Sequence, residues 1–311
     1  DCLLSRGLGD VYKRQIYTLG LLVGLFASCS KESPLDGEQY YKQVYIVGAY
    51  EVVQQFDVAY GDGPQNAYVA VATGGSQNID RNVEVVLTHN DATIEWYNNK
   101  YMLDAPLKYQ KLGDQFCSFP SMSTTIKAGD VYSRLPFTVE TSGLDCDKLY
   151  ALTFKIESVS DYVKQPKDTV LIMNLNLTND FSGIYQMVAI RYTLTDNDEE
   201  LTPSSVNMQR TLKAVNKNQA RFFNVTQNSD LSPTGNITSE DYFNSIDNNG
   251  VTFTRQPDGT FTVAGWKNLP VSNGTVSFED GTFTFCYDYE SGGKRYRLRG
   301  TMTKLSIGIF I

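Results

Sequence analysis

The sequence predicts an all-β protein with two domains, an N-terminal immunoglobulin-like β-sandwich followed by an up-and-down β-barrel. Tyr, Phe, Thr and Val are abundant, and many short segments alternate apolar with polar residues. The turn residues Gly, Asn and Asp recur about every eight to twelve positions, as in sandwiches and barrels. No convincing amphipathic helix of two or more turns precedes residue 238. A chain of 311 residues, less its N-terminal segments, fits two domains better than one.

The first 28 residues are expected to lie outside the folded protein. Residues 1–15 lack an initiating Met and resemble translated adapter sequence from a sequencing assembly; the alternative is a native extension before the signal sequence. Residues 16–28 carry an apolar run that is too short to span a membrane. Because Lys13 and Arg14 precede this run, it has the pattern of a signal peptide.

Phe26-Ala27-Ser28-Cys29 is similar to the lipobox of bacterial lipoproteins, with Phe26 in place of the usual Leu. The resemblance implies cleavage before Cys29 and acylation of that residue; the alternative is a cleaved signal peptide followed by an incidental Cys. Residues 29–39 would then be the lipidated Cys and a polar tether. Lys31-Glu32 resembles the export signal of Bacteroidetes lipoproteins, which implies an outer-membrane location facing the cell exterior.

The first domain is expected over residues 40–178. In its last strand the side chains of Leu171, Met173 and Leu175 share one face, which marks a core face. The predicted strands are residues 44–47, 68–72, 83–87, 135–139, 149–156 and 169–177. In the number of predicted strands, this half resembles an immunoglobulin-like sandwich. The usual pattern of Cys, Trp and Cys in that fold is absent.

The second domain is expected over residues 179–305, after the turn cluster 179–183, with residues 306–311 as a tail. Its predicted strands are residues 185–194, 206–215, 220–227, 251–255, 260–264, 275–279, 282–289 and 295–303. The dipeptides Asp258-Gly259, Asn273-Gly274, Asp280-Gly281 and Gly292-Gly293 are predicted as hairpin turns between strands. One helix is predicted at residues 240–246 with Ser239 as its N-cap.

Eight strands joined by short turns predict an up-and-down barrel. Tyr185 near its start, together with Arg297 or Arg299 on its last strand, resembles the calycin (lipocalin-like) pattern, in which an aromatic ring on the first strand packs beneath a late Arg. Along residues 282–289, aromatic side chains alternate with polar ones, so either face could line the barrel interior. The alternatives are a ligand-binding lumen and a packed core.

The net charge and the numbers of His and Cys residues limit the partners and cofactors that the sequence predicts. Removing residues 1–28 takes away three of the 27 basic and two of the 35 acidic residues, which leaves 24 and 33 and a net charge of −9. With no basic block in an acidic chain, nucleic acid is not an expected partner, and the membrane is expected to be reached through the lipid anchor only. No cofactor or metal site is predicted, because His89 is the only histidine and the cysteines are scattered. For Cys117 and Cys146, a disulfide and free thiols both remain open.

Residues 82–178, especially Trp96-Tyr97-Asn98, Tyr109 and the run at 126–130, resemble an N-terminal domain of unknown function found in Bacteroidetes surface lipoproteins. The second half resembles the calycin-like domain that often follows it. The resemblance implies a role in glycan utilisation or adhesion and carries over no catalytic residue. The implied partners are a glycan or an extracellular protein, with an outer-membrane transporter complex as a further candidate.

Two aromatic clusters are predicted as ligand sites, because aromatic faces stack on sugar rings while amides bond the hydroxyl groups. The first is Trp96, Tyr97, Asn98 and Tyr101, and the second is Trp266 with Asn268. Burial in the core is the alternative for each ring. The leading hypothesis is therefore a non-catalytic surface lipoprotein that binds a glycan. The alternatives are a structural or adhesion subunit that contacts proteins, and a hydrolase of an unrecognised class.

Overall fold

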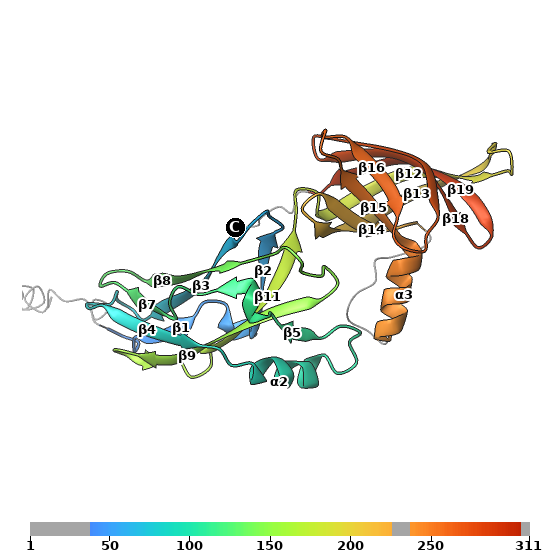
Figure 1. The fold of residues 1–311 in the computed structure, drawn as a ribbon. Coiled ribbons are helices and arrows are strands. Elements are labelled where there is room, and N and C mark those ends of the chain that lie inside the picture. Colours follow the sequence, from blue (N-terminus) through green and yellow to red (C-terminus); the bar gives the residue numbers. More distant parts are fainter. Residues whose placement is uncertain (1–37, 226–236, 306–311) are drawn as a thin grey trace, which may run out of the picture.

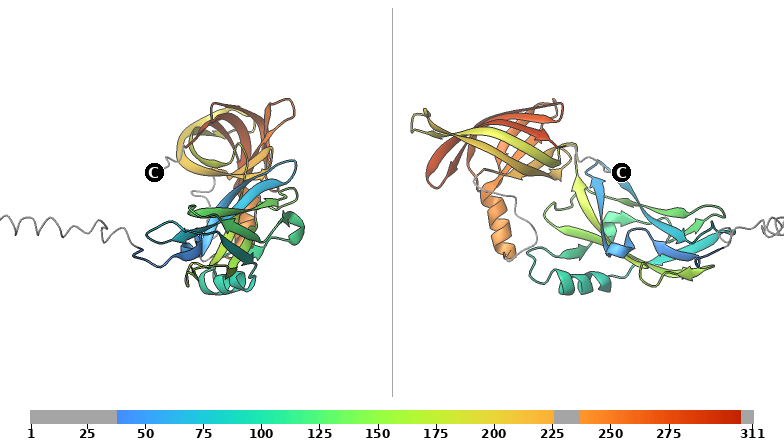
Figure 2. Two further views of the ribbon diagram at one scale, coloured as in Figure 1. Left: turned by 90° about the vertical axis from the view of Figure 1, so that its left-hand side faces the viewer. Right: turned by 180° about the vertical axis from the view of Figure 1, so that it is seen from behind.

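The structure is a computed structural model that describes residues 38–225 and 237–305. The predicted adapter-like segment, signal peptide, lipidation site Cys29 and tail 306–311 lie outside the described residues, as does the tether up to residue 37. Figure 1, and Figure 2 from two further sides, show two β-rich halves, a sandwich and a barrel, joined by a short connection. No helix in the two described stretches is long and apolar enough to cross a membrane.

The N-terminal half is a sandwich of two sheets. The first sheet has the order β10-β1-β3-β8-β6, with bounds Val163–Lys164, Gln43–Ile46, Gln65–Gly74, Tyr132–Val139 and Cys117–Ser118. The second has the order β2-β11-β9-β4-β7, with bounds Val53–Ala59, Val170–Thr178, Leu149–Val159, Val83–Thr88 and Ser123–Ile126. The short β5 (Tyr109–Lys111) also pairs with β9. Inward-facing aliphatic and aromatic residues of both sheets, such as Val71, Phe137 and Phe154, form one core.

The expectation that no helix of two turns occurs before residue 238 is wrong. Helix α2 spans Ala92–Tyr101 and lies along the outside of the sandwich (Figure 1). Six of its ten residues are Thr, Trp, Tyr or Asn, which have modest helix propensity, so local propensity does not predict it. Tertiary contacts stabilise it instead, because Ile94 is buried against Ala151 and Ile172 of the sheet beneath.

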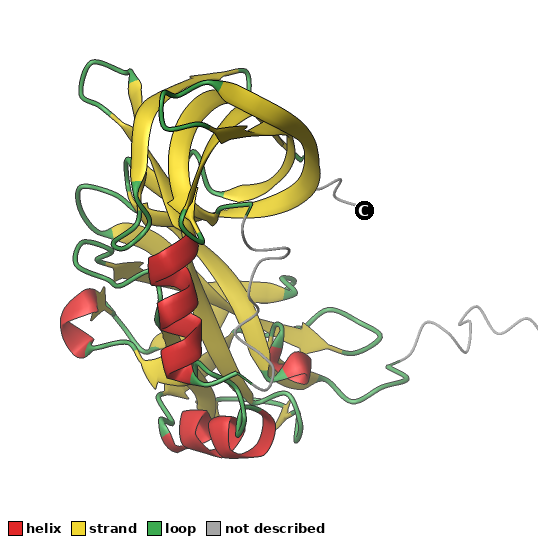
Figure 3. Ribbon diagram, turned by 90° about the vertical axis from the view of Figure 1, so that its right-hand side faces the viewer, coloured by secondary structure: helices red, strands yellow, loops and turns green. Residues whose placement is uncertain are grey.

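The C-terminal half is a closed, up-and-down barrel of eight strands, as predicted. Each strand pairs antiparallel with the next, and β12 pairs with β19 to close the ring seen in Figure 3. The strands are β12 (Gly183–Leu194), β13 (Glu200–Asn216), β14 (Gln219–Phe223), β15 (Gly250–Arg255), β16 (Phe261–Gly265), β17 (Val271–Glu279), β18 (Thr282–Ser291) and β19 (Lys294–Lys304). Gly292 and Gly293 have φ values of 59° and 70°, as the tight β18–β19 hairpin requires.

Three local predictions in this half need correction. Asn273-Gly274 is not a turn: it lies inside β17, at a bulge where the pairing register with β18 shifts and Asn273 has a φ of 49°. The third barrel strand ends at Phe223, short of residue 227. Helix α3 spans Ser239–Asn249, and its N-cap is Thr238, whose hydroxyl accepts a hydrogen bond from the Asp241 backbone.

The barrel interior is packed with aromatic side chains. Phe283, Phe285, Tyr287 and Tyr289 point inward and are buried, so this face of β18 belongs to the core. Tyr185 is also buried, and its hydroxyl donates to the Phe181 carbonyl. The packed alternative therefore describes the interior of this barrel.

The calycin-like placement of a late Arg over the first-strand aromatic is wrong. Arg297 binds Asp288 and Glu200, and Arg299 also binds Glu200, away from the interior. The arginine beside the buried Tyr185 is Arg210 on β13, which is fully buried and directly opposite Tyr185 in the strand register. Its guanidinium donates to the Asn224 carbonyl at 3.3 Å.

Candidate functional site

Helix α2 carries the first predicted cluster and presents its aromatic rings unevenly. Trp96 and Tyr101 are 46 % and 56 % exposed, whereas Tyr97 is partly buried against the sandwich. The Trp96 and Tyr101 rings meet edge to face at 5.8 Å between centroids. The Lys100 ammonium lies 4.9 Å from both ring centres. The helix thus displays an exposed aromatic pair with a lysine over it.

Asn98 is not part of this exposed aromatic surface. Its side-chain amide donates to the Tyr109 carbonyl at 2.7 Å, and its carbonyl oxygen accepts from the Tyr109 backbone N–H at 3.0 Å. Both hydrogen-bonding ends of the amide are therefore used to hold α2 against β5. Asn98 is a structural contact here, and the three aromatic residues are the part of the predicted cluster that the fold brings together.

Trp266 lies in a different environment, at the junction between the two domains. It packs partly buried with Leu107 of the sandwich and with Tyr242 and Ile246 of α3. The Arg221 guanidinium lies 4.7 Å above its ring, and its buried Nε1 has no hydrogen-bond partner among the described residues. Asn268 is exposed in the following loop and donates to the Asn248 side chain. Trp266 is thus mainly a packing residue of the junction.

An ion pair crosses this junction. Arg221 on the outer wall of the barrel forms a bidentate pair with Asp147 of the sandwich, at 2.9 and 2.5 Å, and Lys213 approaches the same carboxylate at 3.4 Å. Burial alone would raise the pKa of Asp147, but the hydrogen bonds and charges of Arg221 and Lys213 together lower it. The charges at the junction are therefore compensated within the protein.

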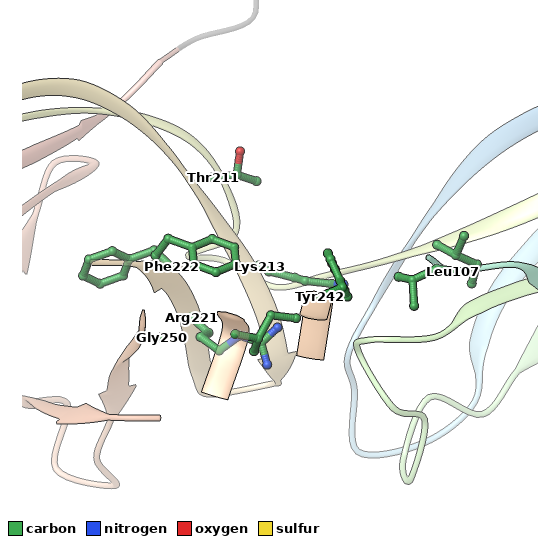
Figure 4. Close-up of a pocket in the computed structure, with 10 residues that line it drawn as sticks. Leu107, Thr211, Lys213, Arg221, Phe222, Tyr242 and Gly250 are labelled. Carbon is green, nitrogen blue, oxygen red and sulfur yellow. The ribbon is translucent and has the colours of Figure 1, made fainter. Parts of the chain in front are cut away.

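A cavity of about 270 Å³ is lined by Arg221 and Lys213 of this ion pair, and Figure 4 shows the residues around it. Its walls come from both domains, with Leu107 and Leu149 on the sandwich side and mostly barrel and α3 residues opposite. Burial raises the pKa of Tyr242, which lines the cavity, to about 12, so its hydroxyl stays neutral. The cavity is largely apolar, and its two cationic side chains already bind Asp147.

The reactive side chains of the described residues lie in environments that do not activate them. Cys117, Cys146 and Cys286 are free thiols, and burial raises the pKa of the Cys146 thiol to about 11, which disfavours the nucleophilic thiolate. Asp145, Cys146 and Asp147 have ligand atoms within 4.8 Å of one another, but Asp147 is held by Arg221. His89 is exposed, and its Nδ1 lies 2.6 Å from the Thr153 carbonyl.

A groove that the sequence analysis missed is formed by outward-facing residues of the first sheet together with residues of β2 and β11 of the second sheet. The strand register places Tyr45 of β1 beside Ala72 of β3, and Ala72 beside Tyr132 of β8. Cross-strand partners face the same side of a sheet, so two tyrosines flank one small residue. Their Cα atoms are roughly 10 Å apart, because neighbouring strands lie about 4.8 Å apart. We call this feature the tyrosine groove; its volume is about 410 Å³, and it also includes Gln54, Phe56, Tyr68, Ala70 and Arg134.

Tyr132 is the most open ring of the groove, with 51 % of its surface exposed. Tyr68 has less freedom, because the Arg134 guanidinium lies 4.3 Å above its ring and Phe56 meets its edge at 5.9 Å. The hydroxyl groups of all three tyrosines lack hydrogen-bond partners within residues 38–225 and 237–305. The groove therefore combines open aromatic surface with free polar groups. A sequence signal existed: Ala70 and Ala72 alternate with the core residues Val69 and Val71, which leaves small residues on the outward face.

Two family models match the sequence, one over each half of the chain. A family model for an N-terminal domain matches residues 40–163, and a model for a C-terminal domain matches residues 169–303. The second match begins with the last sandwich strand, β11. No protein with a curated function matches the sequence.

Solved structures share the fold at low sequence identity. A Bacteroides ovatus protein of unknown function is 18 % identical with a TM-score of 0.58, and covers 85 % of this chain and 94 % of its own. A B. ovatus multidomain protein including DUF1735 is 16 % identical with a TM-score of 0.55, at the same coverages. A B. thetaiotaomicron protein described as an auxiliary nutrient binding protein is 17 % identical with a TM-score of 0.55, covering 81 % and 90 %. The chain thus belongs to a Bacteroidetes family of unknown function in which a β-sandwich precedes an eight-stranded β-barrel.

Proposed function

We propose that this protein is a non-catalytic surface lipoprotein that binds an extracellular glycan in the tyrosine groove. The observation that carries the proposal is the row formed by Tyr45, Ala72 and Tyr132 across three strands. Aromatic walls with a small residue between them leave room for a sugar ring to stack, and sites of this kind need only a few polar groups to orient the ligand. The Gln54 amide, the Arg134 guanidinium and the tyrosine hydroxyls supply such groups.

The rigidity of the groove supports a binding role. Tyr45, Ala72 and Tyr132 stand on strands whose opposite faces are anchored in the sandwich core by residues such as Val71 and Leu135, and the core residues Val69, Leu171 and Met173 line the groove itself. A ligand would therefore meet a preformed surface, and little conformational entropy would be lost on binding. The nutrient-binding description of one structural relative is in keeping with this role. Acylation of Cys29 would hold the sandwich at the outer face of the outer membrane, where glycans arrive and where a transporter complex could receive them.

A protein-binding role is the second candidate function, and the α2 surface favours it. Trp96, Tyr101 and Leu103 are exposed close together in sequence, and exposed aromatic clusters of this kind are typical of protein–protein hot spots. Lys100 lies 4.9 Å from the centres of both rings, closer than the 5.8 Å between Arg134 and the Tyr132 ring centre, so this pair is the more covered platform for a sugar.

A glycan panel with three variants separates these roles. Tyr132→Ala removes the groove wall and Trp96→Ala removes the α2 ring, while Phe243→Ala is the control, because Phe243 is an exposed ring on α3 of the barrel domain. We expect the wild type and the Trp96 and Phe243 variants to bind at least one glycan that the Tyr132 variant does not retain. Loss of binding only in the Trp96 variant would move the site to α2. Absence of glycan binding, or turnover of a bound glycan, would contradict the proposal.

A further inference from the structure

Arg134 is the one charged side chain among the residues that line the tyrosine groove. Its guanidinium lies 4.3 Å from the Tyr68 ring centre and 5.8 Å from that of Tyr132. No acidic side chain lines the groove beside it. The cation is therefore placed against two aromatic rings, which hold its orientation through cation–π contacts.

The guanidinium of Arg134 forms no ion pair or side-chain hydrogen bond with any described residue. Other arginines that lie near acidic groups are paired with them, namely Arg81, Arg221, Arg295, Arg297 and Arg299. Within the groove, no carboxylate of the lining residues neutralises this cation. Its planar fork of N–H donors is free to bind a ligand.

We infer that the ligand of the tyrosine groove is an acidic glycan, whose carboxylate or sulfate group binds Arg134 while a sugar ring stacks on Tyr132. This inference rests on the proposed glycan-binding function. An arginine can bind two oxygens of a carboxylate or sulfate at once, and such charge-assisted pairs are stronger than neutral hydrogen bonds. Tyr68 is a positioning residue, because its ring supports the guanidinium from one side.

The overall charge of the protein defines how this recognition would work. A net charge of −8 repels anions at long range, so the attraction has to come from Arg134 at short range. Short contacts on a partly desolvated surface are screened less by salt than distant ones. Acidic and neutral forms of one glycan should then differ mainly in how long they stay bound, and less in how fast they arrive.

Paired ligands test this inference on the full chain. Calorimetry would compare a uronate-containing oligosaccharide with its carboxyl-reduced form, and a sulfated oligosaccharide with its desulfated form. We expect the wild type to prefer one acidic form by at least about tenfold, equivalent to about 1.4 kcal/mol. Arg134→Gln should abolish that preference and Arg134→Lys should keep only part of it, since Lys lacks the planar fork. Arg255→Gln is the matched control, because Arg255 is an exposed arginine on the barrel strand β15.

Each outcome decides a different claim. Preference for the uronate or for the sulfated form, lost in Arg134→Gln and kept in Arg255→Gln, supports the inference and identifies the anionic group. Equal binding of acidic and neutral forms, or a preference that survives Arg134→Gln, overturns the acidic-ligand inference and leaves glycan binding in place. Failure of all four oligosaccharides and of the wider glycan panel overturns the proposed function, and the inference with it.

Discussion

Asp147 of the sandwich and Arg221 of the barrel are joined by two hydrogen bonds, of 2.9 and 2.5 Å, at the junction of the two domains. Both side chains are almost fully buried. The Arg221 guanidinium also lies 4.7 Å from the centre of the Trp266 ring. A second ion pair between the domains, Lys217 with Asp62, is largely exposed. The junction therefore contains a buried and an exposed version of the same interaction.

Breaking the buried pair should destabilise the protein strongly. Asp147→Asn leaves the Arg221 charge buried without its partner, which costs about 3 to 5 kcal/mol. Asp62→Asn, at the exposed pair, should cost less than about 1 kcal/mol. Chemical denaturation, with the unfolding of each domain followed separately, would measure the unfolding free energies of the two variants. Equal effects of the two variants would show that the buried pair does not hold the junction.

The stability supplied by Asp147 should depend on pH. Its pKa is lower in the folded protein than in the unfolded chain, so its contribution is fully present above the ordinary Asp pKa of about 4 and is lost as pH falls through the lower folded-state value. The difference in unfolding free energy between wild type and Asp147→Asn should therefore be constant near neutral pH and shrink below about pH 4. A difference that grows as the solution becomes more acidic would contradict this assignment.

The two tryptophans should respond differently to substitution. Trp96→Ala should leave the melting temperature almost unchanged, because the ring is half exposed. Trp266→Ala should lower the unfolding free energy by at least about 2 kcal/mol, since it opens a gap beneath Arg221 and α3. In the single-tryptophan proteins Trp266→Phe and Trp96→Phe, acrylamide should quench Trp96 more readily than Trp266. The reverse order of quenching would mean that the junction is open in solution.

The lipid anchor is tested by Cys29→Ala. The thioether to the diacylglycerol needs the cysteine sulfur, so the variant should no longer incorporate labelled fatty acid and should leave the membrane fraction. Cys117→Ala is a suitable control, because Cys117 lies within the sandwich. Label retained by the Cys29 variant would rule out this residue as the acylation site. On intact cells, external protease should cleave the wild-type protein if it faces outward.

The barrel could be predicted because its strands alternate apolar with polar residues and several of its turns contain Gly. All eight strands were expected, because each has its own alternating pattern, and Gly-containing turns at 258–259, 280–281 and 292–293 join three successive pairs. The bounds agree within a few residues except at the start of β13, which begins at Glu200 and not at residue 206, the end of β14 and the start of β17. Asn273-Gly274 was wrongly predicted as a hairpin turn, because a residue with positive φ, such as Asn273, is found both in hairpin turns and in β-bulges. Helix α2 was missed because it is stabilised by burial of Ile94 and by the Asn98–Tyr109 hydrogen bonds, which depend on distant strands.

The candidate site was harder to predict for a related reason. Tyr45, Ala72 and Tyr132 are far apart in sequence and become neighbours only through the pairing of β1, β3 and β8. Local clustering of aromatic and amide residues instead pointed to Trp96 and Trp266. In the structure, Trp96 remains exposed, whereas Trp266 packs at the domain junction. Exposure of single residues could thus be anticipated in part, but a surface assembled across strands could not.

Filling the tyrosine groove tests the central claim most directly. Ala72→Leu places a larger side chain between Tyr45 and Tyr132 without removing any ring or charge, and Ala72 faces outward, away from the core residue Val71. Because Ala72 is only 6 % exposed, the larger side chain should also cost some stability, so binding is compared at a temperature at which the variant is folded. For a glycan that the wild type binds, calorimetry should then show affinity reduced at least about tenfold, or about 1.4 kcal/mol. Wild-type affinity in a folded Ala72→Leu protein would contradict the account, because the ligand would then bind elsewhere.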